Sequence, residues 1–141
     1  MQKILEPILV TIIFVGSYIL NYSCFDTCLS DDVEFNYGKH KKRKIYKETH
    51  GFWRKFFFID IRKMVSRWHY VLFIVNFTAF VLMLILVNIC VLSEENVSRW
   101  LFLICGGVYF LSSVPVVFAR WGLYRGNVVR SRKEYRKNNR K

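Results

Sequence analysis

Residues 70–92 read YVLFIVNFTAFVLMLILVNICVL, and this stretch contains no charged side chain. An α-helix of this length rises about 35 Å, which is enough to cross the roughly 30 Å hydrocarbon core of a bilayer. Two further blocks, 100–119 and 7–25, are also free of charge, although the strongly apolar part of the latter runs only from Ile8 to Leu20. The three blocks predict transmembrane helices at about residues 5–25, 69–92 and 100–119.

The composition of the 141-residue chain supports this interpretation. It is 53% hydrophobic and 18% aromatic, yet it carries a net charge of +12. Buried helices of soluble proteins can also be apolar all round, but here the remaining segments hold nearly all the charge and could not cover three such helices. We therefore predict a single membrane domain, 1–141: an all-α integral membrane protein with three transmembrane helices plus a juxtamembrane amphipathic helix.

The first block could be a retained helix or a cleaved signal peptide. Lys3 followed by residues 8–20 resembles the charged and apolar regions of a signal peptide. Against cleavage, Glu6 and Pro7 stand where positive charge is expected, and no small-x-small cleavage site follows. Retention as a helix is favoured, and cleavage remains the alternative.

The distribution of Lys and Arg predicts the orientation, because cytoplasmic segments keep an excess of positive charge. Residues 26–67 carry eleven Lys and Arg, residues 93–99 carry one, and residues 120–141 carry nine. We expect the long segment and the basic tail to be cytoplasmic, and the N-terminus and the short loop to lie outside. A plasma membrane or inner membrane is the expected location.

Two basic regions follow the first helix. Residues 26–51 are expected to form a cytoplasmic basic loop. Residues 52–67 are expected to form an interfacial amphipathic helix, with Trp53, Phe57 and Ile61 on one side and cations on the other. A nucleic-acid patch is the disfavoured reading, because basic residues beside a membrane are attracted to anionic headgroups. The predicted headgroup contacts are Lys39, Lys41, Lys42, Arg43, Lys44, Arg62, Lys63, Arg67, Arg130, Arg132 and Lys133.

Small and polar residues inside the apolar blocks are candidates for helix packing, since such residues usually face other protein rather than lipid. Cys105 with Ser112, and Gly106 with Ser113, repeat at i+7 and form a narrow strip, while Pro115 should kink the third helix. Ser17, Asn21, Cys24 and Cys28 would share a face if the first helix continued that far; otherwise the cysteines lie in a loop. The predicted packing residues are Ser17, Asn21, Asn76, Cys105, Gly106, Gly107, Ser112, Ser113 and Pro115.

Several kinds of chemistry have no signature in the sequence. The three apolar blocks contain no Asp, Glu, Lys, Arg or His, which argues against ion-coupled transport. Motifs for serine hydrolases, zinc proteases, nucleotide phosphates and dinucleotides are missing. The best metal candidate joins Cys24 and Cys28 to His40 and His50, but these histidines are far apart and embedded among cations. We therefore expect no enzyme, no cofactor and no metal site.

The leading functional hypothesis is a non-enzymatic membrane protein that acts by helix–helix assembly, with itself or with a larger membrane partner, as an accessory or immunity-type subunit. The layout of three helices, an external N-terminus and a basic internal tail is similar to that of phage holins, although the loop of 26–67 is longer than holins usually have. That resemblance implies a pore or lesion-forming effector, and only Thr11, Ser17 and Asn21 approach the polar face a pore needs. The third hypothesis is a sensor of anionic lipid or nucleic acid.

Overall fold

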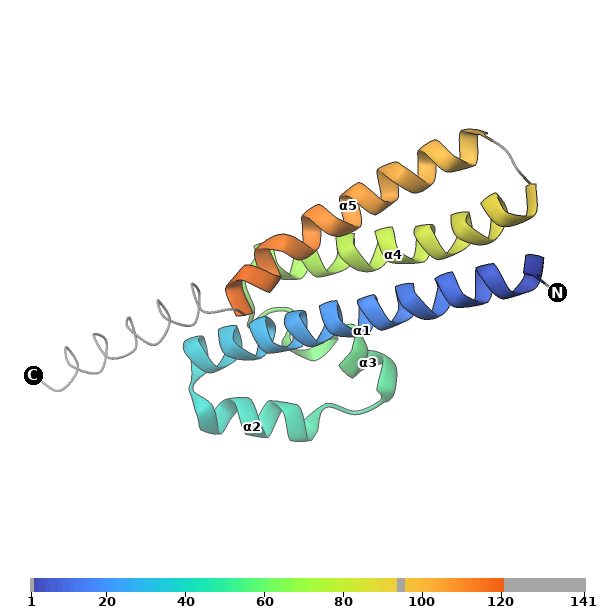
Figure 1. Ribbon diagram of the computed structural model, residues 1–141. Coiled ribbons are helices and arrows are strands. Elements are labelled where there is room, and N and C mark those ends of the chain that lie inside the picture. The colour runs from blue at the N-terminus through green and yellow to red at the C-terminus, as the bar shows by residue number, and fades with distance from the viewer. Residues whose placement is uncertain (1, 94–95, 121–141) are drawn as a thin grey trace, which may run out of the picture. The chain divides into compact units, whose positions relative to one another are not determined.

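The computed structural model describes residues 2–93 and 96–120, with side chains described for 7–89 and 99–118 (Figure 1). Within these residues every regular element is a helix and no strand occurs. The elements are α1 (Gln2–Tyr37), α2 (Lys39–Glu48), α3 (Phe52–Phe56), the 3₁₀ helix η1 (Ile59–Ile61), α4 (Arg67–Ser93) and α5 (Asn96–Arg120).

Three of these helices are long and apolar enough to cross a membrane. The qualifying stretches are Pro7–Tyr37, Arg67–Ile89 and Arg99–Phe118. The prediction of an all-helical chain with three helices of this kind is confirmed. The predicted tail, 120–141, lies beyond the described residues except for Arg120 itself.

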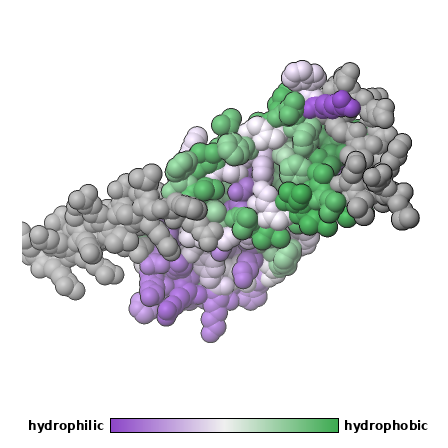
Figure 2. All heavy atoms as spheres, in the orientation of Figure 1, coloured by the Kyte–Doolittle hydropathy of each residue, from purple (hydrophilic) through white to green (hydrophobic). Residues whose placement is uncertain are grey.

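The chain divides into two compact units, of which the first combines Met1–Ser23 with Val71–Pro115. It contains the N-terminal part of α1, most of α4 and most of α5, which lie side by side with α4 running opposite to the other two (Figure 1). Its buried interior includes Tyr18, Phe73, Phe80 and Met83, together with the fully buried Asn76. Bulky apolar side chains cover the outside, as expected for a lipid-facing surface, and Figure 2 shows them gathered on α4 and α5.

The second unit combines Cys24–Tyr70 with Val116–Lys141, and here the structure corrects the expected loop at 26–51. The helix α1 does not end near residue 25 but continues to Tyr37. The reason is a buried stripe at helical spacing, formed by Phe25, Cys28, Leu29 and Val33, which are at most 2% exposed. This also settles the cysteine alternatives, because both Cys24 and Cys28 lie on the helix and are buried.

After α1 the chain reverses at Gly38 and forms the basic helix α2, which runs back along the end of α1 (Figure 1). Gly38 adopts φ +85°, a backbone conformation that L side chains rarely adopt, and its N–H donates to the Glu34 carbonyl at 2.9 Å. Lys42 then pairs with the Glu34 carboxylate at 3.2 Å. In the view of Figure 2, hydrophilic side chains gather on α2.

The predicted amphipathic helix at 52–67 is wrong as a single element. The structure has the short α3, the 3₁₀ helix η1 and turns before α4 begins at Arg67. The break occurs at Phe58, which adopts a left-handed conformation with φ 53° that is uncommon for a bulky residue. This turn leaves Phe58, Ile61 and Val65 buried, while Phe52 and Trp53 remain exposed. Burial of the three apolar side chains offsets the local backbone strain.

Candidate functional site

The most connected group of polar side chains lies inside the first unit and is centred on Tyr109 of α5. The Tyr109 Oη lies 3.1 Å from Ser17 Oγ of α1, in a bond between two hydroxyls. It also accepts a hydrogen bond from Asn21 Nδ2 at 2.6 Å, and the same amide donates to Ser113 Oγ at 2.9 Å. Because Ser17 and Asn21 are one turn apart, both reach α5 from one face of α1.

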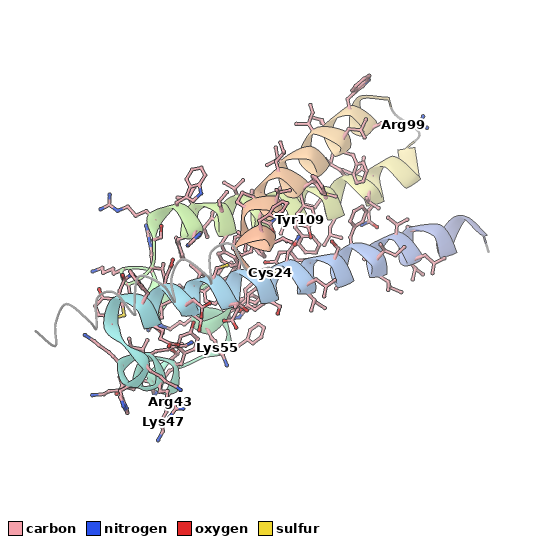
Figure 3. All side chains as sticks on the ribbon, turned by 60° about the vertical axis from the view of Figure 1, so that its left-hand side comes forward. Cys24, Arg43, Lys47, Lys55, Arg99 and Tyr109 are labelled. Atoms are coloured by element: carbon pink, nitrogen blue, oxygen red, sulfur yellow. The ribbon has the colours of Figure 1, made fainter. Side chains whose placement is uncertain are left out.

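The helix α4 joins this network through Asn76, whose side chain is fully buried. Its Nδ2 lies 3.0 Å from the Tyr109 carbonyl, 3.0 Å from Ser112 Oγ and 2.7 Å from Ser113 Oγ. The two serine hydroxyls in turn donate to the Tyr109 carbonyl, at 2.9 Å and 2.7 Å. Within this unit the network therefore ties all three long helices together, and Figure 3 shows Tyr109 among the packed side chains.

Two buried polar atoms beside the network have no hydrogen-bond partner among the described residues: Asn76 Oδ1 and the Tyr18 hydroxyl. The Tyr18 ring stacks on Phe80 with centroids 4.2 Å apart. A buried polar atom without a partner costs roughly 1–3 kcal/mol. The bundle therefore gains from the network around Tyr109 but carries a local penalty at these two atoms.

Of the nine predicted packing residues, five lie in this network: Ser17, Asn21, Asn76, Ser112 and Ser113. The remaining four are distributed differently. A Cβ added to Gly106 would meet Met83 of α4 at 3.9 Å, whereas one added to Gly107 would meet nothing within 4 Å. Pro115 lies within α5, which the structure assigns as one helix. The predicted strip is thus divided between the interior and the outer surface.

The fourth of these residues, Cys105, lines an apolar groove of about 270 Å³ on the outside of α4 and α5. Small or short side chains from both helices, Thr78, Ala79 and Cys105, lie in it. Longer aliphatic side chains form the rest of its lining, namely Ile74, Val75, Leu82, Ile104 and Val108. By contrast, Asn88 on α4 is exposed and donates to the Leu84 carbonyl of its own helix at 2.7 Å.

The second unit contains a buried acid–imidazole pair that the sequence analysis did not anticipate. His69 Nδ1 lies 2.8 Å from Asp32 Oδ2, and the Ser66 N–H donates to the same oxygen at 3.2 Å. The side chains are 12% and 5% exposed. These two bonds join Asp32 of α1 to the residues at the start of α4.

The predicted headgroup residues are mostly exposed, but several have partners within the chain. Lys42 is paired with Glu34, Lys41 lies over the Tyr37 ring at 4.8 Å and Arg62 over the Tyr70 ring at 5.6 Å. Figure 3 labels Arg43 and Lys47, which project from α2. The exposed cations also include Lys39, Lys44, Lys63 and Arg67, whereas Arg130, Arg132 and Lys133 lie outside the described residues.

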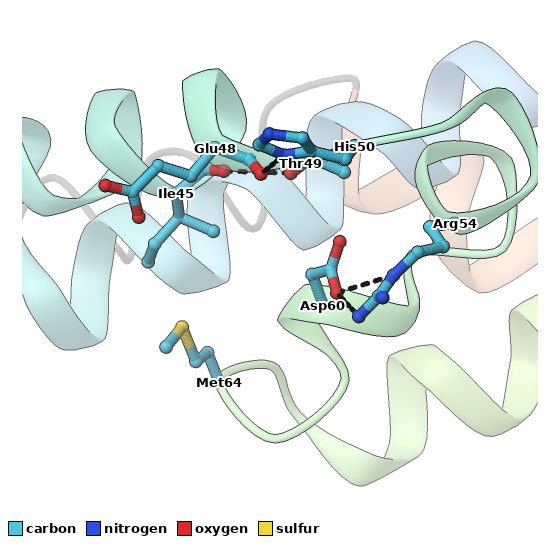
Figure 4. Close-up of a pocket in the computed structure, with 7 residues that line it drawn as sticks. All are labelled: Ile45, Glu48, Thr49, His50, Arg54, Asp60 and Met64. Carbon is cyan, nitrogen blue, oxygen red and sulfur yellow. Dashed lines mark hydrogen bonds and ion pairs between the residues drawn. The ribbon is translucent and has the colours of Figure 1, made fainter.

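A polar cavity of about 340 Å³ lies between α2 and the α3–η1 segment (Figure 4). Arg54 and Asp60 pair across one side of it at 2.5 Å, and His50 Nδ1 contacts the Glu48 carbonyl. Glu48 points away from Asp60, so the carboxylates do not converge on one point (Figure 4). Among the described residues, no three His, Cys, Asp or Glu side chains are placed to hold a metal ion.

Comparison with known proteins adds no assignment, because no family model, curated protein or solved structure matches this chain. The chemistry must therefore be inferred from the residues. The network around Tyr109 consists of hydroxyls, amides and a backbone carbonyl, which are groups that hold helices together rather than transfer protons at neutral pH. The groove offers an apolar surface with three small or short side chains, which suits contact with another helix.

Proposed function

We propose that this chain is a non-enzymatic integral membrane protein that acts by helix–helix assembly, and that its groove on α4 and α5 packs against a second copy. The groove is the observation that carries the proposal. Transmembrane helices associate through close packing at small residues, and the groove places Thr78, Ala79 and Cys105 between ridges of longer side chains.

A second copy suits the groove because an isologous two-fold contact uses the same patch on both partners. Such a contact would place one α4–α5 groove against another and bring the two Cys105 side chains close together. It needs no charged or polar complement, and the groove lining is apolar apart from the Thr78 hydroxyl and the Cys105 thiol. A larger membrane protein is the other partner to be tested.

The alternative of a pore receives less support from the same contacts. A pore formed by several copies needs a polar face that points away from each bundle. Ser17 and Asn21, which supply most of the polar face of α1, are bonded to Tyr109 and Ser113 inside the unit. Exposed positions of the same helix include Ile12, Ile13, Ile19 and Leu20. A helix with this exterior suits contact with lipid or with an apolar helix.

The orientation belongs to the same proposal. The basic helix α2 and its flanks carry most of the described cations and would face the cytoplasm by the positive-inside rule. The N-terminus and the segment between α4 and α5 would lie outside, in a plasma membrane or an inner membrane. This arrangement leaves the groove within the bilayer, where only another helix or lipid can reach it.

Disulfide cross-linking of membranes tests the assembly. In a chain with Cys24→Ala, Cys28→Ala and Cys90→Ala, oxidation should rapidly join the Cys105 thiols of two copies in a disulfide. A dimer should then appear on a non-reducing gel. The matched control adds Cys105→Ala and Gly107→Cys, which moves the thiol two residues along α5 to a position that does not line the groove. That variant should remain a monomer.

Equal cross-linking of both variants would indicate random collision and would contradict a specific contact at the groove. No cross-linking of either variant, together with comigration of the native chain with another membrane protein on a native gel, would replace the second copy by a larger partner. Monomers in both experiments would end the assembly hypothesis.

A further inference from the structure

The second unit exposes an aromatic surface on the short helix α3. Phe52 is 71% exposed and Trp53 is 66% exposed. The ring centroids of Phe52 and Trp53 are 5.3 Å apart. Behind them, the Phe56 ring lies 5.9 Å from that of Phe52, and the Phe57 ring lies 6.1 Å from that of Trp53. We call these four residues the aromatic cluster. A contiguous surface of exposed aromatic rings is characteristic of a site that contacts another protein or a membrane.

Cationic side chains lie within and shortly after the aromatic cluster in the sequence. Arg54 and Lys55 are exposed within α3, although the Arg54 guanidinium is already paired with Asp60. Two further exposed cations, Arg62 and Lys63, follow shortly in the chain. Exposed aromatic rings combined with Lys and Arg are the composition of segments that lie in the interface of an anionic membrane. The charge of the segment is thus complementary to anionic headgroups.

The aromatic cluster is close in the chain to a helix that is apolar enough to cross a membrane. Ten residues, 57–66, separate α3 from α4, which begins at Arg67. The cluster therefore stays within reach of the membrane surface that α4 would enter.

We propose that α3 is an interfacial anchor whose Phe52 and Trp53 insert among the headgroups of the membrane that the chain's own helices cross. Lys55 would contact lipid phosphates beside them, and anionic phospholipid is the ligand. This anchor is independent of the contact at the groove, because it uses other residues and a different surface. It assigns a binding role to α3 that neither helix packing nor assembly explains.

Tryptophan fluorescence tests the anchor in the full chain. A variant with Trp68→Phe, Trp100→Phe and Trp121→Phe retains Trp53 as the only tryptophan. In vesicles that contain phosphatidylglycerol, its emission should be shifted to the blue and quenched by lipids brominated near the glycerol end of the acyl chain. Lipids brominated near the methyl end should quench it less, and aqueous iodide should have little effect.

The matched control places the only tryptophan on α2, by adding Trp53→Phe and Lys47→Trp. Lys47 is exposed in the last turn of the basic helix and is not among the predicted headgroup contacts, so iodide should quench this tryptophan while brominated lipids should not. Quenching of Trp53 by iodide to the same extent as the control would overturn the anchor. Protection of Trp53 from both iodide and brominated lipid would also overturn it, because another protein surface would then cover the rings.

Hydrogen–deuterium exchange of the unaltered chain provides a second test that does not depend on substitutions. Backbone amides of residues 52–57 should exchange more slowly in phosphatidylglycerol vesicles than in phosphatidylcholine vesicles, since anionic lipid draws α3 into the interface. Equal exchange in the two lipids, when amides of α4 remain protected in both, would contradict the proposed anionic ligand.

Discussion

Asp32 of α1 and His69 of α4 form a buried pair in which the carboxylate oxygen and the imidazole nitrogen are 2.8 Å apart. The same oxygen accepts the N–H of Ser66, just before α4 begins. One side chain therefore both orients an imidazole and satisfies a backbone donor at a helix start. A buried carboxylate is costly unless it is bonded in this way, so the three groups stabilise one another.

We expect Asp32→Ala to lower the free energy of unfolding by roughly 1–3 kcal/mol, because it leaves the Ser66 N–H and the His69 ring without this acceptor. Asp32→Asn retains an oxygen that can accept one of these bonds and should cost less. Unfolding in bicelles, followed by steric trapping, measures both variants. A smaller loss for alanine than for asparagine would contradict the role given to the carboxylate position.

The network around Tyr109 predicts that two asparagines on α4 contribute differently to the stability of the bundle. Asn76→Leu removes an amide that reaches Tyr109, Ser112 and Ser113, and should destabilise the bundle by roughly 0.6–2 kcal/mol. Among the described residues Asn88 bonds its own helix, so Asn88→Leu serves as the control. Thermal unfolding in detergent should separate the two variants, and equal midpoints would mean that the network does not hold the helices together.

Two tyrosines provide a second matched comparison. Tyr109→Phe removes the hydroxyl that binds Ser17 and Asn21, so we expect a loss of roughly 0.6–2 kcal/mol. Tyr18→Phe keeps the ring stacked on Phe80 and removes a buried hydroxyl that has no partner among the described residues. It should be neutral or stabilising. Denaturant titration monitored by circular dichroism measures both, and the reverse order of stability would contradict the hydrogen bonds described above.

The reversal between α1 and α2 depends on Gly38. Its φ of +85° disfavours any residue with a Cβ, so Gly38→Ala should cost about 1–2 kcal/mol. The control is Gly16→Ala, at a helical position of α1 where an added Cβ meets nothing within 4 Å. That change should be neutral or slightly stabilising, because alanine favours helix. Protease cleavage between α1 and α2 should increase in the first variant alone.

The three apolar helices could be predicted from the sequence because each has an uninterrupted apolar stretch, whereas the segment between the first two could not be assigned correctly. Residues 26–37 contain Asp31, Asp32 and Glu34, and this acidic character favoured a loop. The helical stripe of Phe25, Cys28, Leu29 and Val33 was the signal that would have extended α1. For residues 52–67 the helical pattern was present, but the left-handed turn at Phe58 depends on tertiary burial.

The residues of the candidate site could also be predicted only in part from the sequence. Polar residues inside apolar helices are conspicuous, so Ser17, Asn21 and Asn76 could be selected from the sequence alone. Tyr109 was missed because a tyrosine within an apolar helix resembles any other aromatic core residue. Asp32 and His69 are 37 positions apart and carry no common motif, so only the packing of α1 against the start of α4 brings them together.

The burial of two cysteines on α1 means that the chain carries its own chemical reporter. Cys24 and Cys28 are 7% and 2% exposed, so an alkylating reagent should reach them only when the second unit opens. Cys105 is more accessible and lines the groove of the first unit. In a chain with Cys90→Ala, the time course of labelling at Cys24 and Cys28 would report local opening, and that at Cys105 would report occupancy of the groove. Mass spectrometry of a single sample could follow both events separately.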